Sequence, residues 1–417
     1  MAKPESGRAY DPAVGRLLDH LAEPPIAHPL TQTYHLPLSP LVLAYLAAAL
    51  VLGVALAVPQ SGVRSGHPGR PETTSWAGSL SAPQMATRVV AVALLGLAIA
   101  AGRLGEDDEL ENLAPALVVG AGWPLLVLAS VVLGPVWRWV DPWDAVARAL
   151  VRGDDSEPPG HVWPAAFAAL AWVWYLGAYS HPLSPRSVGA ALAVYTVVTV
   201  AGCLAFGRVR WLASSEVFGV ALSWLALLPR RGLAGWTPPR GAPALLGVLV
   251  GGLVFGAARR SEIWGDLNTE PHAELLAGLG LMGTCAVACG LLALVASVAA
   301  TPARRAIAPA LLPAAAGVVV AVAMDSNRLT TSLQLLPGLL GDPFGSGWDL
   351  LGRAGAGLDP APFGISGLLA IQLGLLLAGF LAGGVVLARG APRRPRRPVA
   401  GGLSLLAGAS VIALASH

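Results

Sequence analysis

The chain is organised around residues 113–150, LAPALVVGAGWPLLVLASVVLGPVWRWVDPWDAVARAL. The first part of this stretch, Leu113 to Val136, carries no charge. At ~1.5 Å per residue, a helix of this length crosses a hydrocarbon core of ~30 Å. Trp137, Arg138 and Trp139 follow directly, and tryptophan with arginine after an apolar run is typical of a membrane–water boundary. The stretch therefore predicts a membrane span that ends at an interface.

The end of the same stretch predicts a short amphipathic helix that lies along the membrane surface. Asp141 can cap its first turn, and Pro142 suits the first helical position, where no N–H donor is needed. Asp144 and Arg148 are spaced i,i+4, which predicts an ion pair on the polar face. We expect Trp143 to face lipid or neighbouring helices and Arg148 to face headgroups or solvent. The apolar face consists of Trp143, Val146, Ala147 and Leu150.

Composition indicates the same class of protein. Hydrophobic residues make up 55% of the chain and charged residues only 12%, with a mean hydropathy of +0.64, whereas soluble domains carry about 25% charged residues. Lys3 is the only lysine, so 26 of the 27 basic residues are arginine, a bias typical of GC-rich bacterial genomes. No basic and aromatic stripe for nucleic acid is present. We predict an all-α, polytopic protein of the bacterial plasma membrane whose partners are the lipid bilayer and other membrane or extracytoplasmic subunits.

Apolar runs predict ten membrane spans and one doubtful segment, residues 212–229, which is flanked by arginines. Ten spans place 17 basic residues inside and 9 outside, against 15 and 11 for eleven spans. The positive-inside rule therefore favours ten, anchored by the arginine-rich loop 389–397. Both termini are then external, 1–37 is an N-terminal tail, 38–417 is one transmembrane domain, and 142–152 and 212–229 lie on the cytoplasmic surface. The predicted spans are 38–58, 82–102, 113–136, 162–180, 187–207, 242–258, 275–300, 306–336, 365–387 and 399–416.

A polar run from Met324 to Thr331 interrupts what would otherwise be one long helix. Charged groups at membrane depth are costly and often functional, which makes Asp325, Asn327 and Arg328 a candidate polar cluster. Asp325 and Arg328 are three residues apart. Two interpretations stay open: a structural pair in which each side chain neutralises the other, or part of a functional cavity.

Polar residues also gather in the predicted external loops. Asp342, Trp348 and Asp349 belong to a turn-rich run that we interpret as a structured loop re-entering the interface through Trp348. Four histidines on the same side form a candidate site for a copper or zinc ion, with solvated loop residues as the alternative interpretation. These histidines are His28, His35, His181 and His272.

Four stretches resemble a known family. They are Asn112-Leu113-Ala114-Pro115; Gly134-Pro135-Val136-Trp137 leading to Pro142-Trp143; Phe206-Gly207-Arg208 leading to Trp211; and Asp342-Pro343-Phe344-Gly345 leading to Gly347-Trp348-Asp349. On these residues, and over most of the chain from about His28, the sequence is similar to the actinobacterial multi-pass membrane proteins called fenitrothion hydrolases. The resemblance implies hydrolysis of an organophosphate triester, without a catalytic motif to carry over residue by residue. Members have Ala-His-Gly after a signal peptide, whereas this chain has Ala27-His28-Pro29 after a charged tail.

Two functional hypotheses follow. In the first, the chain is a permease-like or complex-forming membrane component that works through the interrupted helix at Asp325 and the surface helices. In the second, it is an enzyme in which a metal-bound hydroxide near the four histidines attacks phosphorus. The sequence lacks a clustered set of metal ligands, which favours the first hypothesis.

Overall fold

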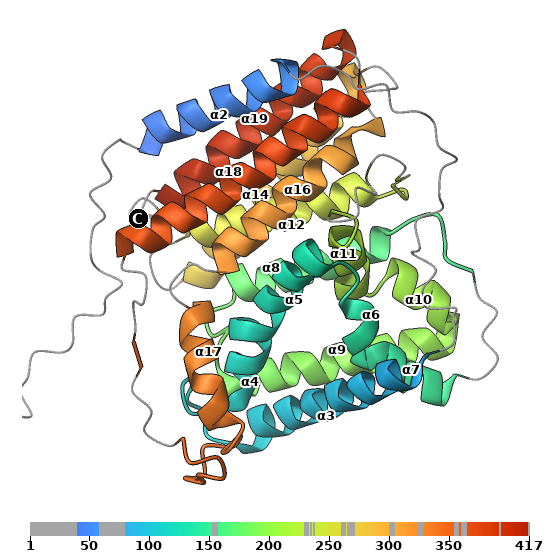
Figure 1. Ribbon diagram of the computed structural model, residues 1–417, viewed down its shortest axis with the longest axis vertical. Helices are drawn as coiled ribbons and strands as arrows, with labels where there is room; N and C mark the ends of the chain where they lie inside the picture. The colour runs from blue at the N-terminus through green and yellow to red at the C-terminus, as the bar shows by residue number, and fades with distance from the viewer. Residues whose placement is uncertain are drawn as a thin grey trace, which may run out of the picture. The chain divides into compact units, whose positions relative to one another are not determined.

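The computed structural model (Figure 1) describes residues 40–57, 80–151, 157–228, 233, 236, 238–259, 264, 272–299, 305–323, 328–353, 358–359, 365–391 and 393–415. All of them belong to one compact unit, Leu36–His417. Within these ranges the chain is helical and has no β-strand, only an isolated bridge between His161 and Arg240. This confirms the all-α fold. The N-terminal tail predicted at 1–37 lies outside the described residues.

The helices follow the apolar runs of the sequence, and each run predicted to span the membrane overlaps at least one of them. The helices are α2 (Pro40–Ala57), α3 (Ala82–Leu104), α4 (Leu113–Pro115), the π-helix η2 (Ala116–Gly122), α5 (Trp123–Leu133), α6 (Trp137–Val140), α7 (Pro142–Leu150), α8 (Trp163–Gly177), α9 (Pro185–Phe206), α10 (Arg208–Ser214), α11 (Val217–Leu225), α12 (Ala242–Ala258), α14 (Ala273–Val298), α16 (Ile307–Ala323), α17 (Arg328–Leu339), α18 (Ile365–Gly390) and α19 (Arg393–Ala415).

Five helical segments of the described chain are long and apolar enough to cross a membrane, which is compatible with a membrane protein. They are Ala82–Leu104, Leu113–Leu133, Pro185–Phe206, Ala273–Val298 and Gly367–Gly390. Three shorter apolar helices are Val42–Ala57, Ala242–Gly256 and Ile307–Val322. The total of ten spans stays a prediction.

Glycine permits the close packing of α16 against α18 (Figure 1). A Cβ atom added to Gly379 of α18 would lie 2.5 Å from the carbonyl oxygen of Pro313 and 2.9 Å from Cα of Gly317, both in α16. Small residues at helix contacts let main chains approach within membranes. The two helices therefore touch through their backbones. Helix α18 also packs on α2 and α19, and α2 packs along α19.

The arginine-rich loop predicted at 389–397 is largely helical. Helix α18 continues to Gly390 and α19 begins at Arg393, so only a short junction separates them. Arg396 is fully buried there. Its guanidinium donates to the carbonyl oxygens of Ala388 (2.7 Å) and Leu56 (2.6 Å). Carbonyls in the last turn of a helix lack a helical partner, and Arg396 supplies one for α2 and α18.

Residues 113–133 form a continuous helical segment whose middle is a π-helix, η2. Asn112 caps its start, because its Oδ1 accepts from the N–H of Ala114 at 3.0 Å. Helix α17 packs on η2, where a Cβ atom at Gly120 would lie 1.9 Å from Oγ of Ser332. Wide π-turns inside helices are often found at functional positions. The helix type was not foreseen from the uniformly apolar sequence.

Helix α7 confirms its predicted cap and the predicted contact of Trp143 with neighbouring helices. Asp141 Oδ1 accepts from the N–H of Asp144 at 2.9 Å, and Arg148 pairs with Asp144 as expected from their spacing. Trp143 and Ala147 of the predicted apolar face are buried, and Leu150 of that face is exposed. Asp144 is fully buried as well, which was not predicted, because arginines from two other helices reach it.

Residues 212–229 do not form one surface-lying helix. Glu216 accepts from the main-chain N–H groups of Phe218 and Gly219, which ends α10 and caps α11. Helix α11 packs against α5, α6, α8, α10 and α16. The prediction of a surface location was wrong, because side chains on several sides of these two helices are buried. They include Leu212, Val217, Val220, Leu222 and Trp224.

Candidate functional site

Asp144 lies at the centre of a buried group of arginines. Its carboxylate pairs with Arg88 of α3, with Arg148 of α7 (2.9 Å between Nε and Oδ2) and with Arg208 of α10 (2.5 Å between Nη1 and Oδ1). Arg88 and Arg208 are buried as well. Because charges interact more strongly away from water, these pairs tie three helices together. We call these four residues the Asp144 cluster.

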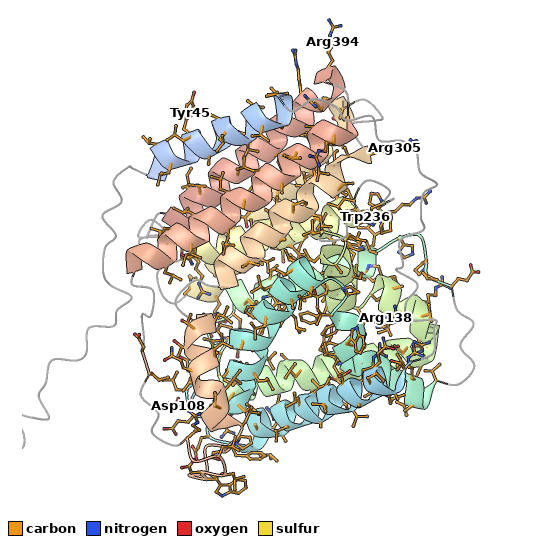
Figure 2. All side chains as sticks on the ribbon, in the orientation of Figure 1. Tyr45, Asp108, Arg138, Trp236, Arg305 and Arg394 are labelled. Carbon is orange, nitrogen blue, oxygen red and sulfur yellow. The ribbon has the colours of Figure 1, made fainter. Side chains whose placement is uncertain are left out.

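Arg88 also holds α6 against α3. Its Nε and Nη2 donate to the main-chain carbonyl oxygen of Arg138 at 3.1 and 2.7 Å, and Figure 2 labels Arg138 on α6. Thr87 Oγ1 donates to the carbonyl oxygen of Trp139 at 2.6 Å. Helix α6 has only four residues, so these carbonyls lack the usual helical partners. Arg88 therefore serves both as a cation for Asp144 and as a donor to an interrupted backbone.

Aromatic rings join α7, α9 and α11 beside the cluster. Trp143 stacks on Phe218, with ring centroids 5.9 Å apart, and meets Tyr195 edge-on at 4.9 Å. Its Nε1 donates to Oγ1 of Thr196 at 3.1 Å. Aromatic pairs of this kind stabilise packing beyond the area they bury. Phe218 further contacts Trp123, Trp137 and Trp172.

Glu216 is a second buried acidic group, in the break between α10 and α11. The Tyr195 hydroxyl donates to its Oε1 at 2.5 Å, and the N–H groups of Phe218 and Gly219 donate to its two oxygens. Burial, and then the nearby Asp141 carboxylate, raise the pKa of Glu216 to about 8. Glu216 is therefore an acid that holds its proton near neutral pH.

The residues predicted at the interface occupy different environments. Trp137 and Trp143 are buried in the aromatic group, Asp141 is fully buried, and Trp139 is 42% exposed. Arg148 is partly exposed and pairs with Asp144. Arg148 thus belongs to the Asp144 cluster, and Asp141 and Trp143 lie beside it.

The predicted polar cluster at 325–328 is described only at Arg328. Helix α16 ends at Ala323, just before the polar run, and α17 begins at Arg328, within it. Asp325 and Asn327 lie outside the described residues. Their pairing and burial stay predictions.

The predicted external loop is built on Asp342. Its carboxylate accepts from the N–H groups of Ser346, Gly347 and Trp348 at 3.0, 2.6 and 2.9 Å. Asp349 Oδ1 accepts from the N–H of Arg353 at 2.6 Å, and Trp348 is exposed. These bonds make both aspartates structural residues of a turn.

The same loop binds the start of the segment 113–133. The carbonyl oxygen of Phe344 accepts from the N–H of Glu106 at 2.9 Å, and that of Pro343 accepts from the N–H of Leu113 at 3.2 Å. Two of the stretches that carry the family resemblance are therefore in contact.

The histidines of the predicted copper or zinc site are described only in part. His28 and His35 lie outside the described residues. His181 and His272 are exposed, and Nδ1 of His181 lies 2.7 Å from Oγ of Ser180. No group of three or more His, Cys, Asp or Glu side chains able to hold a metal is found in the described part of the chain. A metal site that includes His28 and His35 stays a prediction.

No protein-family model, curated protein or solved structure matches this chain.

Sequence reasoning missed four residues of this region as site candidates: Arg88, Arg208, Glu216 and Tyr195. Arg88 and Glu216 carried a usable signal, because each is a lone charge inside an apolar run. Arg208 lies after a helix end, where an arginine is ordinary. Tyr195 is an uncharged residue in a long span and gave no signal.

Proposed function

We propose that this chain is a permease-like, multi-pass component of the bacterial plasma membrane, and that solute or ion movement is centred on the Asp144 cluster. The observation that carries the proposal is a buried carboxylate that pairs with three arginines, two of them buried, where the long helix α3 meets the short helices α7 and α10. Charged side chains inside membrane proteins are costly and mark solute or ion pathways. A purely structural helix contact does not need four charged side chains.

Backbone breaks around the cluster support the same function. Gly207 separates α9 from α10 with φ 90°, and Gly134 ends α5 with φ 97°; both values favour glycine. Glu216 separates α10 from α11. The two glycines lie at the ends of the predicted spans 113–136 and 187–207, and irregular backbone next to the hydrocarbon core is enclosed by protein or lines a cavity. Secondary transporters build their solute sites from such discontinuous helices.

We also propose a membrane topology for the chain, with ten spans and both termini external. A reporter that is active only outside the cytoplasm is then expected to work after His417 and to fail near Arg394. The opposite pattern would require an odd number of spans or an inverted protein.

Charge movement in liposomes tests the proposed function directly. Purified protein is reconstituted on a solid-supported membrane and exposed to inorganic anions, organic acids, amino acids and sugars as probes. We expect transient currents with at least one probe class and a loss of at least about tenfold in D144N. Asp107→Asn, which changes a partly exposed carboxylate, serves as the matched control and is expected to keep the current.

A second variant tests the Asp144 cluster even if D144N does not fold. Arg148→Gln removes the partly exposed arginine and leaves Arg88 and Arg208 on Asp144. If D144N does not fold, a reduced current in R148Q supports the proposal. Absence of current with every probe, or unchanged current in the folded variants, contradicts it. Metal-dependent turnover of an aryl phosphotriester without any current would instead support the hydrolase implied by the family resemblance.

A further inference from the structure

Glu216 has an unusual combination of burial and neighbours. Its side chain is 1% exposed and lies in the break between two short helices. All of its hydrogen bonds come from neutral groups: the hydroxyl of Tyr195 and the main-chain N–H groups of Phe218 and Gly219. The ion pairs found among the described residues involve Asp144 or Asp107 and not Glu216.

The electrostatic consequence follows from burial. A buried carboxylate without a cationic partner is costly, and it lowers its free energy by taking up a proton. The Asp141 carboxylate adds repulsion to an ionised Glu216. Three neutral donors oppose this effect by favouring the ionised form. Glu216 is therefore balanced between two protonation states.

The elements around α11 add few charges to this balance. Helices α5 and α16 carry no ionisable side chain. From α9, the hydroxyl of Tyr195 also accepts from the N–H of Val217 at 3.2 Å. The remaining ionisable residues on the helices that pack against α11 are Tyr175 on α8, Arg138 on α6, and Arg208 and Arg210 on α10.

We propose that Glu216 is a reversible proton-binding site and that loss of its proton loosens the junction between α10 and α11. In the protonated state the neutral carboxyl sits in its buried position beside Tyr195 without an electrostatic penalty. In the ionised state it repels Asp141, and the junction between α10 and α11 either admits water or changes its conformation. The site does not depend on the proposed permease function, because it needs only a buried carboxyl at a helix break.

The proton on Glu216 makes the free energy of unfolding depend on pH. The pKa of Glu216 is raised from 4.5 to about 8 by burial and by Asp141. The folded chain therefore binds this proton more tightly than the unfolded chain does. Stability from this group is fully present below pH 4.5, and it is lost as pH rises through about 8.

Infrared spectroscopy of the full-length protein in lipid nanodiscs tests the proton site. The C=O stretching band of a buried, protonated carboxyl is followed through a pH titration. We expect the wild-type band to disappear with a midpoint near 8 and to be absent from E216Q. Glu109→Gln, a change to an exposed acid, is the matched control and is expected to keep the band.

Hydrogen exchange tests the effect on the junction. Peptides covering 208–225 are compared below and above the midpoint after correction for the intrinsic effect of pH. We expect several-fold faster exchange above the midpoint in the wild type and no such change in E216Q.

A second variant keeps the proposal testable if E216Q does not fold. Asp141→Asn keeps a capping oxygen but removes the negative neighbour, so it is expected to lower the midpoint of the Glu216 band. A wild-type band that is absent throughout, or that persists in E216Q, contradicts the proton site. An unmoved midpoint in D141N contradicts the role of Asp141, and pH-independent exchange at 208–225 contradicts the junction effect.

Discussion

The Asp144 cluster and the contact between α16 and α18 join helices in opposite ways. In the cluster, α3, α7 and α10 are linked by long charged side chains that meet at one carboxylate. Between α16 and α18, Gly317 and Gly379 remove the side chains altogether, and the backbones touch. One contact depends on charge and the other on volume.

This difference separates two tasks within the same protein. An arginine side chain can change rotamer, so a charged contact tolerates small shifts of its helices but not the loss of its counter-charge. A glycine contact has no side chain to rearrange, so it tolerates changes of pH but not an added methyl group. The first kind of contact suits a region that changes state, and the second suits a rigid scaffold.

Removing the charge of Asp144 is expected to have the largest effect. D144N leaves Arg88, Arg148 and Arg208 without the carboxylate that they share. Breaking a buried pair by removing one partner costs about 3–5 kcal/mol. The measurement is the free energy of unfolding in detergent, with Glu109→Gln as the exposed control. A D144N protein as stable as the wild type would show that the cluster is not a structural contact.

A methyl group at the glycine contact is expected to have the next largest effect. In G379A the new Cβ meets main-chain atoms of Pro313 and Gly317, so α16 and α18 must separate. Overpacking of this kind costs about 1–3 kcal/mol. The matched control is G374A in the same helix, where a Cβ meets nothing within 4 Å. Equal melting temperatures for the two variants would contradict the backbone contact.

The N-cap of α7 is expected to contribute less to the free energy of unfolding. D141A removes the oxygen that accepts from the N–H of Asp144, and loss of an N-cap costs about 0.5–2 kcal/mol. D141N also lacks the charge but keeps a capping oxygen. Their difference in unfolding free energy isolates the cap from the charge, and no difference would show that the cap is dispensable.

The smallest effect is expected at an exposed ion pair. Nε of Arg186 lies 3.3 Å from Oδ2 of Asp107, and the two side chains are 62% and 43% exposed. Exposed pairs contribute about 0–1 kcal/mol, and salt screens them. We expect D107N to lower the melting temperature slightly in dilute buffer and not in high salt. A loss comparable to that of D144N would show that the exposed pair stabilises the protein as much as the buried cluster does.

The helices were largely predictable from the sequence, because apolar runs and capping residues such as Asn112 and Asp141 act locally. The burial of Asp144 was not. Periodicity places Asp144 on the polar face of α7, but it gives no information about Arg88 and Arg208, which approach from 56 and 64 positions away. The π-helix η2 was missed for a similar reason, because its sequence is apolar throughout and its contact with Ser332 is distant in the chain.

Arg396 has a consequence for biosynthesis. It donates to Leu56 across 340 positions of the chain, so the end of α2 obtains this donor only after 340 further residues have been made. Until then, the emerging protein must keep that carbonyl hydrated or hold it with another partner. The end of α2 and the start of α19 are therefore completed together. If translation stops before Arg396, the carbonyl of Leu56 does not obtain this donor.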